Sequence, residues 1–346
     1  MFNPTPFAAA SIGQVHTAAL GDDKTIAIKV QFPGVKESIQ SDLDQMLTMM
    51  GVTMKKDSRG FHQNKDVFGA YKEAWLLECD YKLEADNLRK YTSYLRADTE
   101  TGLTDHFDVP EVVDELSAER VLAMSFVSGT TIDQLCGSHV AQSVRDATAE
   151  RLVRIKMKEL FSWCFLNADP HLGNFVFNAT THKLGLLDFG FCKQFPRKSA
   201  SHVAQLFLGC ADADRDAAFG WFHKVGMVGP QDKEGWDQQL FEFYKFVFSP
   251  FHSDEPFAFK PWFDDPRMKG FMDGVSYQNA EWAKQEAVKY DDGSVRVVDP
   301  TLTLMCEYIL QILLHCGRLR AVVSVRKYLV NAVAELRARE AAEPDE

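Results

Sequence analysis

One stretch, residues 163–190, constrains this chain more than any other. It contains Asp169 and Asn174, five positions apart, and Asp188, which follows fourteen positions later at the end of an apolar run. Carboxylate and amide oxygens are the ligands that a hard dication such as Mg²⁺ prefers. Such a cation gathers the negative oxygens of several phosphates, so the stretch predicts metal-assisted phosphate chemistry.

The order of these groups is typical of phosphoryl transfer in kinase-like folds. In those folds an Asp orients or deprotonates the attacking hydroxyl, an Asn holds Mg²⁺, and the Asp of Asp-Phe-Gly bridges Mg²⁺ to the β- and γ-phosphates. The plainer alternative is that Asp188 caps a strand and Asn174 lies in an ordinary turn. Agreement between two separate pieces of sequence favours the catalytic interpretation.

Composition limits the class of protein. With 346 residues, 46% of them hydrophobic and 25% charged, the chain suits one large globular domain or two lobes. A net charge of −11 argues against nucleic-acid binding. The seven cysteines show no Cys-x-x-Cys pair and indicate free thiols in a reducing compartment. No apolar run approaches the length of a membrane span, and no targeting segment is visible at the N-terminus.

The N-terminal residues predict an Ala-rich loop and a hairpin. Residues 7–15 read Phe-Ala-Ala-Ala-Ser-Ile-Gly-Gln-Val, and strands are predicted up to residue 20 and over 25–30, where Lys29 lies. In kinase-like folds this loop covers the phosphates and the strand Lys reaches them. Ala replaces most of the usual Gly, so we expect a different hold on the nucleotide. The alternative for Lys29 is a solvated strand lysine.

A long helix is predicted over residues 66–95. Its phase is set by an apolar stripe of Val67, Tyr71, Ala74 and Trp75. Glu78 falls within that stripe, and a buried carboxylate needs a partner, so we expect it to pair with Lys29. Asp80 and Glu84 fall on the other side, as a second acidic cluster or as a solvated face.

The next segments predict a hinge and the approach to the catalytic loop. Residues 120–127 read as a strand that ends at Ser-Gly and lines an adenine site, which makes Met124 and Phe126 candidate contacts; the Ser-Gly-Thr-Thr that follows is also an ordinary helix start. Residues 145–166 are strongly helical and lead to Asp169.

The sequence around the catalytic loop argues against an extended protein substrate. Asp169 follows Asn167-Ala168 instead of His-Arg, and the chain after Gly190 enters a helical pattern near residue 199 with no Ala-Pro-Glu motif. We expect a small molecule, a lipid head group or water as the acceptor. His171 contacts either a phosphate or, as we favour, its own turn.

The C-terminal part is rich in Phe and Trp. Between residues 236 and 263 these rings predict either packing within the lobe, which we favour, or a surface for a prenyl lipid or membrane. A polar, loop-rich insertion is predicted over residues 264–292, and a closing helix pair over 302–336.

Five motifs in order carry a family resemblance: Ala-Ala-Ala-Ser-Ile-Gly-Gln-Val-His, Ile-Ala-Ile-Lys-Val-Gln-Phe-Pro-Gly-Val, Glu-Cys-Asp-Tyr-x-x-Glu-Ala, Asp-Pro-His-Leu-Gly-Asn-Phe and Leu-Leu-Asp-Phe-Gly. With them the chain resembles the UbiB family of atypical kinases, also called aarF-domain-containing kinases. The resemblance covers residues 7–190 well and the rest loosely. The aromatic run before Asp169 is similar to the branch that supports coenzyme Q biosynthesis in mitochondria.

The resemblance implies an α+β, protein-kinase-like bilobal fold. Residues 1–127 would form a small N-lobe with an antiparallel sheet and a long helix, and residues 128–346 a larger, mostly helical C-lobe. It implies binding of ATP or ADP with Mg²⁺, and kinase or ATPase activity in ubiquinone or other prenyl-lipid metabolism at a membrane. The implied partners are a prenyl lipid or quinone precursor, the membrane surface and coenzyme Q biosynthetic proteins. The implied place is the matrix side of a mitochondrial membrane, with plastid and cytoplasm as alternatives.

The family's site residues carry over as follows. The catalytic groups are Asp169, Lys29 and Glu78, with Glu78-x-Asp80 as the acidic motif, and the metal ligands are Asn174 and Asp188. The nucleotide contacts are Ala8, Ala9, Ala10, Ser11, Gly13, Lys29, Met124 and Phe126.

Two departures from the family pattern stand out. Members carry an N-terminal helical extension with a Lys-x-Gly-Gln motif, and this sequence starts almost at the Ala-rich loop, so we expect either a fragment or a loss of that control. The hinge also has Ser125 where an acidic residue is expected. Two other functions stay open: a small-molecule phosphotransferase of the aminoglycoside- or choline-kinase type, which the Ala-rich loop disfavours, and a nucleotide-binding scaffold without turnover.

Overall fold

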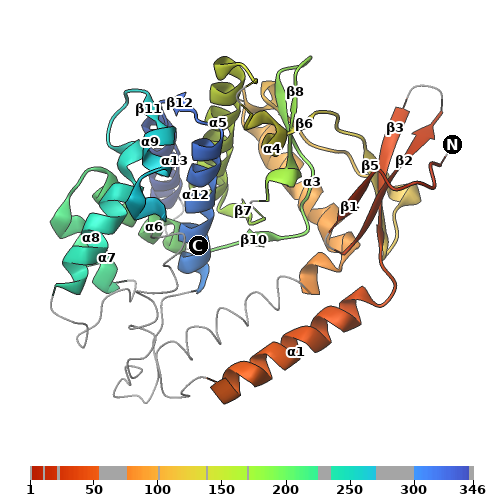
Figure 1. Cartoon of the computed structure of the whole chain (residues 1–346), viewed down its shortest axis with the longest axis horizontal. Helices are drawn as coiled ribbons and strands as arrows, with labels where there is room; N and C mark the ends of the chain where they lie inside the picture. Colours follow the sequence, from red (N-terminus) through yellow and green to blue (C-terminus); the bar gives the residue numbers. More distant parts are fainter. Residues whose placement is uncertain are drawn as a thin grey trace. The chain divides into compact units, whose positions relative to one another are not determined.

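The computed structural model describes residues 2–10, 12–21, 24–53, 76–99, 102–137, 139–169, 171–224, 235–269 and 300–342 (Figure 1). The chain packs as two compact units. Unit 1 comprises Met1–Met46, Gly69–Leu135 and Asn167–Lys193, and unit 2 comprises Leu47–Phe68, Cys136–Leu166 and Gln194–Glu346. Unit 1 is sheet-rich and unit 2 is helical, as expected of an α+β chain. The predicted lobes, residues 1–127 and 128–346, divide the chain differently and stay a prediction.

The first sheet of unit 1 carries the Ala-rich segment and Lys29, and the three alanines form strand β1 (Ala8–Ala10) instead of the predicted loop. Its strands run in the order β1-β2-β3-β5 and are all antiparallel, with bounds Ala8–Ala10, Gly13–Leu20, Lys24–Gln31 and Val121–Ser125 (Figure 1). Lys29 on β3 lies opposite Val15 on β2 and Leu122 on β5. The predicted hairpin is therefore confirmed. Gly21, which starts its turn, has a φ of 71°, a conformation that glycine adopts at little cost.

The second sheet brings the predicted metal ligands together. Its order is β4-β9-β8-β6, with bounds Phe107–Asp108, Lys183–Leu186, Phe175–Asn178 and Thr130–Thr131; the β4–β9 pair is parallel and the others antiparallel. Asn174 ends the 3-10 turn η4 (Leu172–Asn174) just before β8, and Asp188 follows β9. The Leu187 amide donates to the Asn174 carbonyl at 3.0 Å. A local hairpin thus explains the spacing between Asn174 and Asp188.

The predicted long helix is interrupted. Residues 66–75 lie outside the described part of the chain, residues 76–78 are helical, and a new helix, α3 (Tyr81–Ala97), begins after a break at Cys79 and Asp80. The Asp80 carboxylate caps α3 by accepting from the amides of Lys82 and Leu83 at 3.0 and 3.1 Å. A single continuous helix was therefore wrong.

Helix α1 (Val35–Thr53) belongs partly to each unit. The other helical elements described in unit 1 are short. The short elements are η1 (Leu103–Asp105), η2 (Asp114–Leu116) and α4 (Ile132–Leu135).

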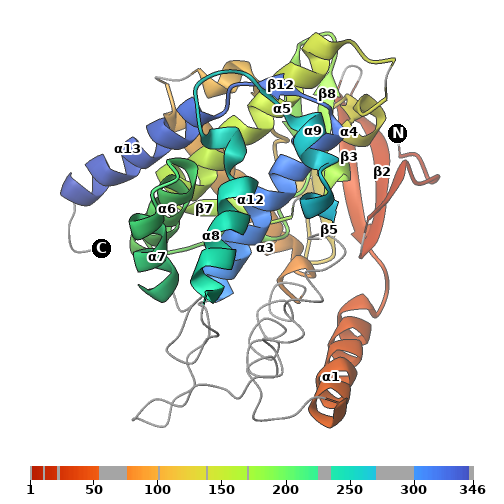
Figure 2. The same ribbon diagram turned by 60° about the vertical axis from the view of Figure 1, so that its left-hand side comes forward.

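Unit 2 is built from helices (Figure 2). They are α5 (Gln142–Met157), α6 (Arg197–Ala211), α7 (Arg215–Lys224), α8 (Trp236–Val247), α9 (Phe259–Phe263), α12 (Pro300–Arg318) and α13 (Arg326–Ala342), with η5 (Ser249–Phe251) and the paired strands β11 (Phe257–Ala258) and β12 (Val322–Val323). The last two helices confirm the predicted closing pair.

The helix before the catalytic loop ends earlier than predicted. After α5 the chain continues as a π-helical segment, η3 (Lys158–Trp163), and Cys164 ends it with a φ of 50°. Residues 165–167 form a strand, β7 (Phe165–Asn167), instead of helix, and a further strand, β10 (Cys192–Gln194), follows the Asp-Phe-Gly sequence. Because the π-helical segment ends in a residue with left-handed backbone, the chain cannot continue as a regular helix, and the extended segment begins there.

The aromatic residues of unit 2 form its core. Phe241, Phe248, Phe251, Phe259 and Trp262 are buried. The ring of Phe248 lies 4.3 Å from that of Phe207, between ring centroids, and 6.1 Å from that of Phe251. The packing interpretation is confirmed for these residues. Within the described residues, no helix is both long and apolar enough to span a membrane.

Gly13 lies where the backbones of β2 and β3 approach too closely for a side chain. A Cβ atom at this position would lie 2.2 Å from the Val30 carbonyl oxygen. Because backbone cannot yield as a flexible side chain does, we expect Gly13→Ala to lower the free energy of unfolding by roughly 2–3 kcal/mol in denaturant titrations. Gly220→Ala is the control, since nothing lies within 4 Å of its added Cβ in α7 and Ala favours helix. Equal stability of the two variants would contradict the prediction.

Candidate active site

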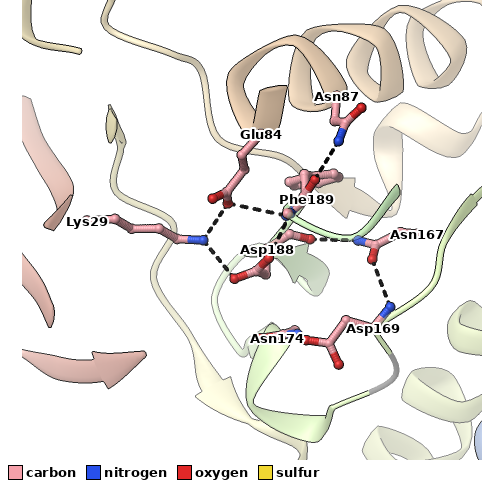
Figure 3. A network of polar contacts seen from close by, with 9 residues as sticks. Lys29, Glu84, Asn87, Asn167, Asp169, Asn174, Asp188 and Phe189 are labelled. Atoms are coloured by element: carbon pink, nitrogen blue, oxygen red, sulfur yellow. Dashed lines mark hydrogen bonds and ion pairs between the residues drawn. The ribbon is translucent and has the colours of Figure 1, made fainter. Parts of the chain in front are cut away.

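Lys29 is the centre of the candidate site (Figure 3). Its ammonium donates to Glu84 Oε1 at 2.5 Å and to Asp188 Oδ2 at 2.8 Å. The Lys29 and Glu84 side chains are only 7% and 3% exposed, so both charges are withdrawn from water and each needs the other. Strand β3, helix α3 and the Asp-Phe-Gly segment therefore meet at one nitrogen atom.

The charges around Lys29 explain its protonation. Burial alone would lower the pKa of Lys29, but the carboxylates of Asp188 and Glu84 raise it well above its usual range. Burial would raise the pKa of Asp188, and the Lys29 ammonium holds it below its ordinary value instead. Lys29 is therefore a stable cation and Asp188 a carboxylate, the states suited to phosphate and metal respectively.

The helix glutamate that pairs with Lys29 is Glu84, and the expected pairing with Glu78 was wrong. The helical phase of residues 67–75 places Glu84 on the far side only if the helix continues through Cys79 and Asp80, and the break there resets the phase. The signal for Glu84 is present in the sequence: α3 buries an apolar stripe that includes Tyr81, Ala85, Leu88, Tyr91 and Leu95. Glu84 lies within that stripe, behind an Asp in N-cap position.

Glu78 lies beside the same site, and its predicted catalytic role stays a prediction. Its Cγ atom would be 3.5 Å from a Cβ built on Gly190, which places the side chain against the Asp-Phe-Gly turn. Burial, with the nearby carboxylates of Asp188, Asp169 and Glu84, raises the pKa of Glu78 to about 7. The break in the helix lets both Glu78 and Glu84 face the site, although they are six positions apart.

The catalytic loop is held by its own side chains (Figure 3). Asn174 Nδ2 donates to Asp169 Oδ2 at 2.5 Å, and the Asp169 amide donates to Asn167 Oδ1 at 3.4 Å. The His171 amide donates to Asp169 Oδ1 at 3.1 Å, and the His171 ring accepts from the Gly173 amide at 3.1 Å. The favoured turn role of His171 is confirmed.

The predicted nucleotide contacts occupy different parts of the first sheet. Ala8, Ala9 and Ala10 form β1, Ser11 lies outside the described residues, and Gly13 faces the β3 backbone. Met124 is buried within β5. These residues share the sheet that carries Lys29, and their contact with a nucleotide stays a prediction.

At the end of β5, Phe126 meets Phe7. The two rings make an edge-to-face contact with 5.5 Å between centroids. The backbone amides of Ser125 and Phe126 already donate to the carbonyls of Glu111 and Thr25. A ligand at this edge would therefore meet side chains instead of these two amides.

The donor set fits Mg²⁺. Asp188 supplies a carboxylate and Asn174 an amide oxygen, and Asp169 lies within hydrogen-bond distance of Asn174. Within the described residues, no group of three His, Cys, Asp or Glu side chains forms a metal cage.

Comparison with known proteins decides the family. Residues 1–220 match the ABC1 atypical kinase-like domain. The chain belongs to this family. It is 37% identical to the mitochondrial atypical kinase COQ8B of Rattus norvegicus over 211 residues, which cover 61% of this chain and 38% of the relative. It is 30% identical to the mitochondrial atypical kinase COQ8 of Saccharomyces cerevisiae over 272 residues, 78% of this chain and 52% of the relative.

These matches confirm the resemblance to atypical kinases of the COQ8 and UbiB type, and they span about half or less of each relative. The fold is similar to that of Rv3197 from Mycobacterium tuberculosis, solved in a complex with erythromycin. The TM-score is 0.65 at 22% identity, over 94% of this chain and 76% of the other. The kinase-like fold is confirmed.

Glu78 makes the stability of the protein depend on pH. Its pKa is near 4.5 when unfolded and about 7 when folded, so the folded state binds the proton more tightly. The stabilisation is complete below pH 4.5 and is lost as the pH rises through 7. Relative to Glu78→Gln, the wild type should lose roughly 3 kcal/mol of unfolding free energy from pH 4.5 to 8, measured without nucleotide. If the unfolding free energies of the wild type and Glu78→Gln changed equally with pH, the prediction would be contradicted.

Proposed function

We propose that this protein is an atypical kinase or ATPase that binds ATP or ADP with Mg²⁺. One observation carries the proposal: the buried Lys29 ammonium donates hydrogen bonds to both Glu84 and Asp188. Beside it, Asn174 donates a hydrogen bond to Asp169. A lysine for phosphate, a carboxylate for metal and a carboxylate for the acceptor are the parts that phosphoryl transfer needs.

Each residue has a distinct task in this proposal. Asp188 and Asn174 hold Mg²⁺, which neutralises phosphate charge when bound. Lys29 moves from Asp188 toward the phosphates, and Glu84 keeps its ammonium oriented. Asp169 orients the acceptor hydroxyl or water and accepts its proton.

The short exit from the site favours a small acceptor. Only residues 191–196 separate Gly190 from helix α6, which begins at Arg197. A segment of this length offers no extended platform for a peptide. We therefore place a small molecule, a lipid head group or water at Asp169.

The biological context of the proposal comes from the relatives. Several are named as mitochondrial COQ8 kinases, and an Arabidopsis thaliana relative, Protein ACTIVITY OF BC1 COMPLEX KINASE 7, is chloroplastic. We propose a role in ubiquinone or other prenyl-lipid biosynthesis at an organelle membrane, with a prenyl lipid or quinone precursor and coenzyme Q biosynthetic proteins as partners. The mitochondrion is the favoured organelle.

Asp188→Asn tests the proposed function. At a nucleotide concentration of ~100 times Kd, Mg-ATP should stabilise the wild type by about 2.7 kcal/mol in thermal unfolding. The variant should lose this increment and its release of phosphate from ATP. Release is measured with and without vesicles that contain a prenyl quinone, and lipid stimulation would favour an acceptor or regulator at the membrane.

Asp108→Asn is the matched control, because Asp108 pairs with Lys183 on the second sheet and is partly exposed. It should bind and turn over ATP like the wild type. If the wild type binds nucleotide but releases no phosphate, with or without the vesicles, the result would support a nucleotide-binding scaffold without turnover. Equal stabilisation of wild type and Asp188→Asn would overturn the metal role.

Phe7 is the residue we place against the nucleobase. It directly precedes the Ala-rich segment, is 65% exposed, and contacts Phe126 edge-on. An exposed aromatic face of this kind can stack on a base, which is worth roughly 1–3 kcal/mol. Among the described residues, Phe7 is the second most exposed large apolar side chain, and a base stacked there would cover it.

Phe7→Ala should weaken Mg-ATP binding about 10-fold in calorimetry, because a stacking contact of ordinary strength is lost. Binding of Mg-tripolyphosphate, which has no base, should not change. Phe2→Ala is the control: its ring is also half exposed on this sheet but lies against His16, 5.1 Å between centroids. A Phe7→Ala protein that binds Mg-ATP like the wild type would contradict the placement.

A further inference from the structure

The backbone of the Asp-Phe-Gly segment is held at successive residues by buried side-chain amides (Figure 3). Asn167 Nδ2 donates to the Asp188 carbonyl at 2.6 Å, and Asn87 Nδ2 donates to the Phe189 carbonyl at 3.0 Å. The two asparagines are 2% and 8% exposed. Asn87 comes from α3 and Asn167 from the end of β7, so two elements grip adjacent peptide groups.

Helix α3 holds both backbone groups of Phe189. Glu84 Oε1 accepts from the Phe189 amide at 3.4 Å, and Asn87 donates to the carbonyl of the same residue. Glu84 and Asn87 are three residues apart, so they lie on one face of the helix. The Phe189 ring is buried against Tyr91 of the same helix, with 5.0 Å between centroids. Backbone and ring are thus anchored to a single face of α3.

This anchoring sets the direction of the Asp188 side chain. Asn167 and Glu84 hold the two polar groups of the Asp188–Phe189 peptide, its carbonyl and its N–H, and Asn87 holds the carbonyl of the next peptide. These contacts restrict how the Asp188 backbone can turn. Its carboxylate then reaches Lys29 through Oδ2 and the Gly190 amide through Oδ1, at 2.8 and 2.9 Å. A rotation that exchanged Asp188 and Phe189 would leave buried Asn87 and Glu84 groups without these partners.

We propose that Asn87 is a positioning residue that, together with Asn167, orients the Asp188 carboxylate for the divalent cation before the nucleotide arrives. The inference rests on the proposed function, since it assigns the metal role to Asp188. Asn87 acts through the Phe189 carbonyl and contacts neither metal nor nucleotide. Loss of the Asn87 side-chain donor should therefore weaken only the part of nucleotide binding that depends on the metal.

The test compares nucleotide affinity with and without metal in the full chain. Asn87→Leu has nearly the same volume and removes the donor. Its affinity for ATP in Mg²⁺ should fall about 10-fold, and its affinity for ATP in EDTA should change less than 2-fold. The Mg²⁺ concentration for half-maximal ATP binding should rise by a similar factor. Asn87→Ser, which is too short to reach the carbonyl, should give the same pattern and replaces Asn87→Leu if that variant does not fold.

Asn178→Leu is the matched control. Asn178 Nδ2, at the exposed turn of the β8–β9 hairpin, also donates to a backbone carbonyl, that of Ser128 at 3.3 Å. It should keep the wild-type Mg²⁺ dependence even if it is less stable.

The outcomes separate the two proposals. Equal losses of ATP affinity in Mg²⁺ and in EDTA for Asn87→Leu would show general damage and overturn the positioning role, as would unchanged affinities in both. A wild type whose ATP binding does not depend on Mg²⁺ would overturn the proposed function, and the inference with it.

Discussion

The buried ion pair between Lys29 and Glu84, shared with Asp188, is the interaction on which the rest of the site depends. A buried ammonium without its carboxylates would be strongly destabilising, so β3, α3 and the Asp-Phe-Gly segment must meet for any of them to be stable there. These three segments are far apart in the sequence. The sheet fixes where Lys29 lies, and the β8–β9 hairpin fixes where Asp188 lies. The energetic need to pair one cation thus brings the candidate metal and phosphate ligands to the same place.

The break before α3 decides which carboxylates take part. Asp80 caps the new helix, and the Gln31 side chain donates to the Cys79 carbonyl at 2.7 Å, which satisfies a group that the break frees. Gln31 and Lys29 are two residues apart on β3, so one strand face holds both the break and the ion pair. As a result Glu84 pairs with the Lys29 ammonium, while Glu78 lies against Gly190 near other carboxylates. An uninterrupted helix would turn one of the two away from the site.

The groups of the site belong to unit 1, and the Phe-rich core belongs to unit 2. The aromatic residues that could have signalled a lipid surface are therefore largely explained by packing. The family match covers residues 1–220 and so includes every residue of the Lys29 network. The Lys29 network accordingly lies in the part of the chain that matches the ABC1 atypical kinase-like domain.

The sequence by itself determined the family and the identity and order of the candidate catalytic groups. Asp169, Asn174 and Asp188 could be found because one local hairpin brings them together, and Lys29 because alternation on a strand is a local pattern. Only the tertiary structure decided the partners. Glu84 was missed because helical phase does not survive a break, and the contact from Asn87 to Phe189 spans 102 residues. Spacing along a chain reports neighbours on one element, whereas a buried hydrogen bond between elements depends on how they pack.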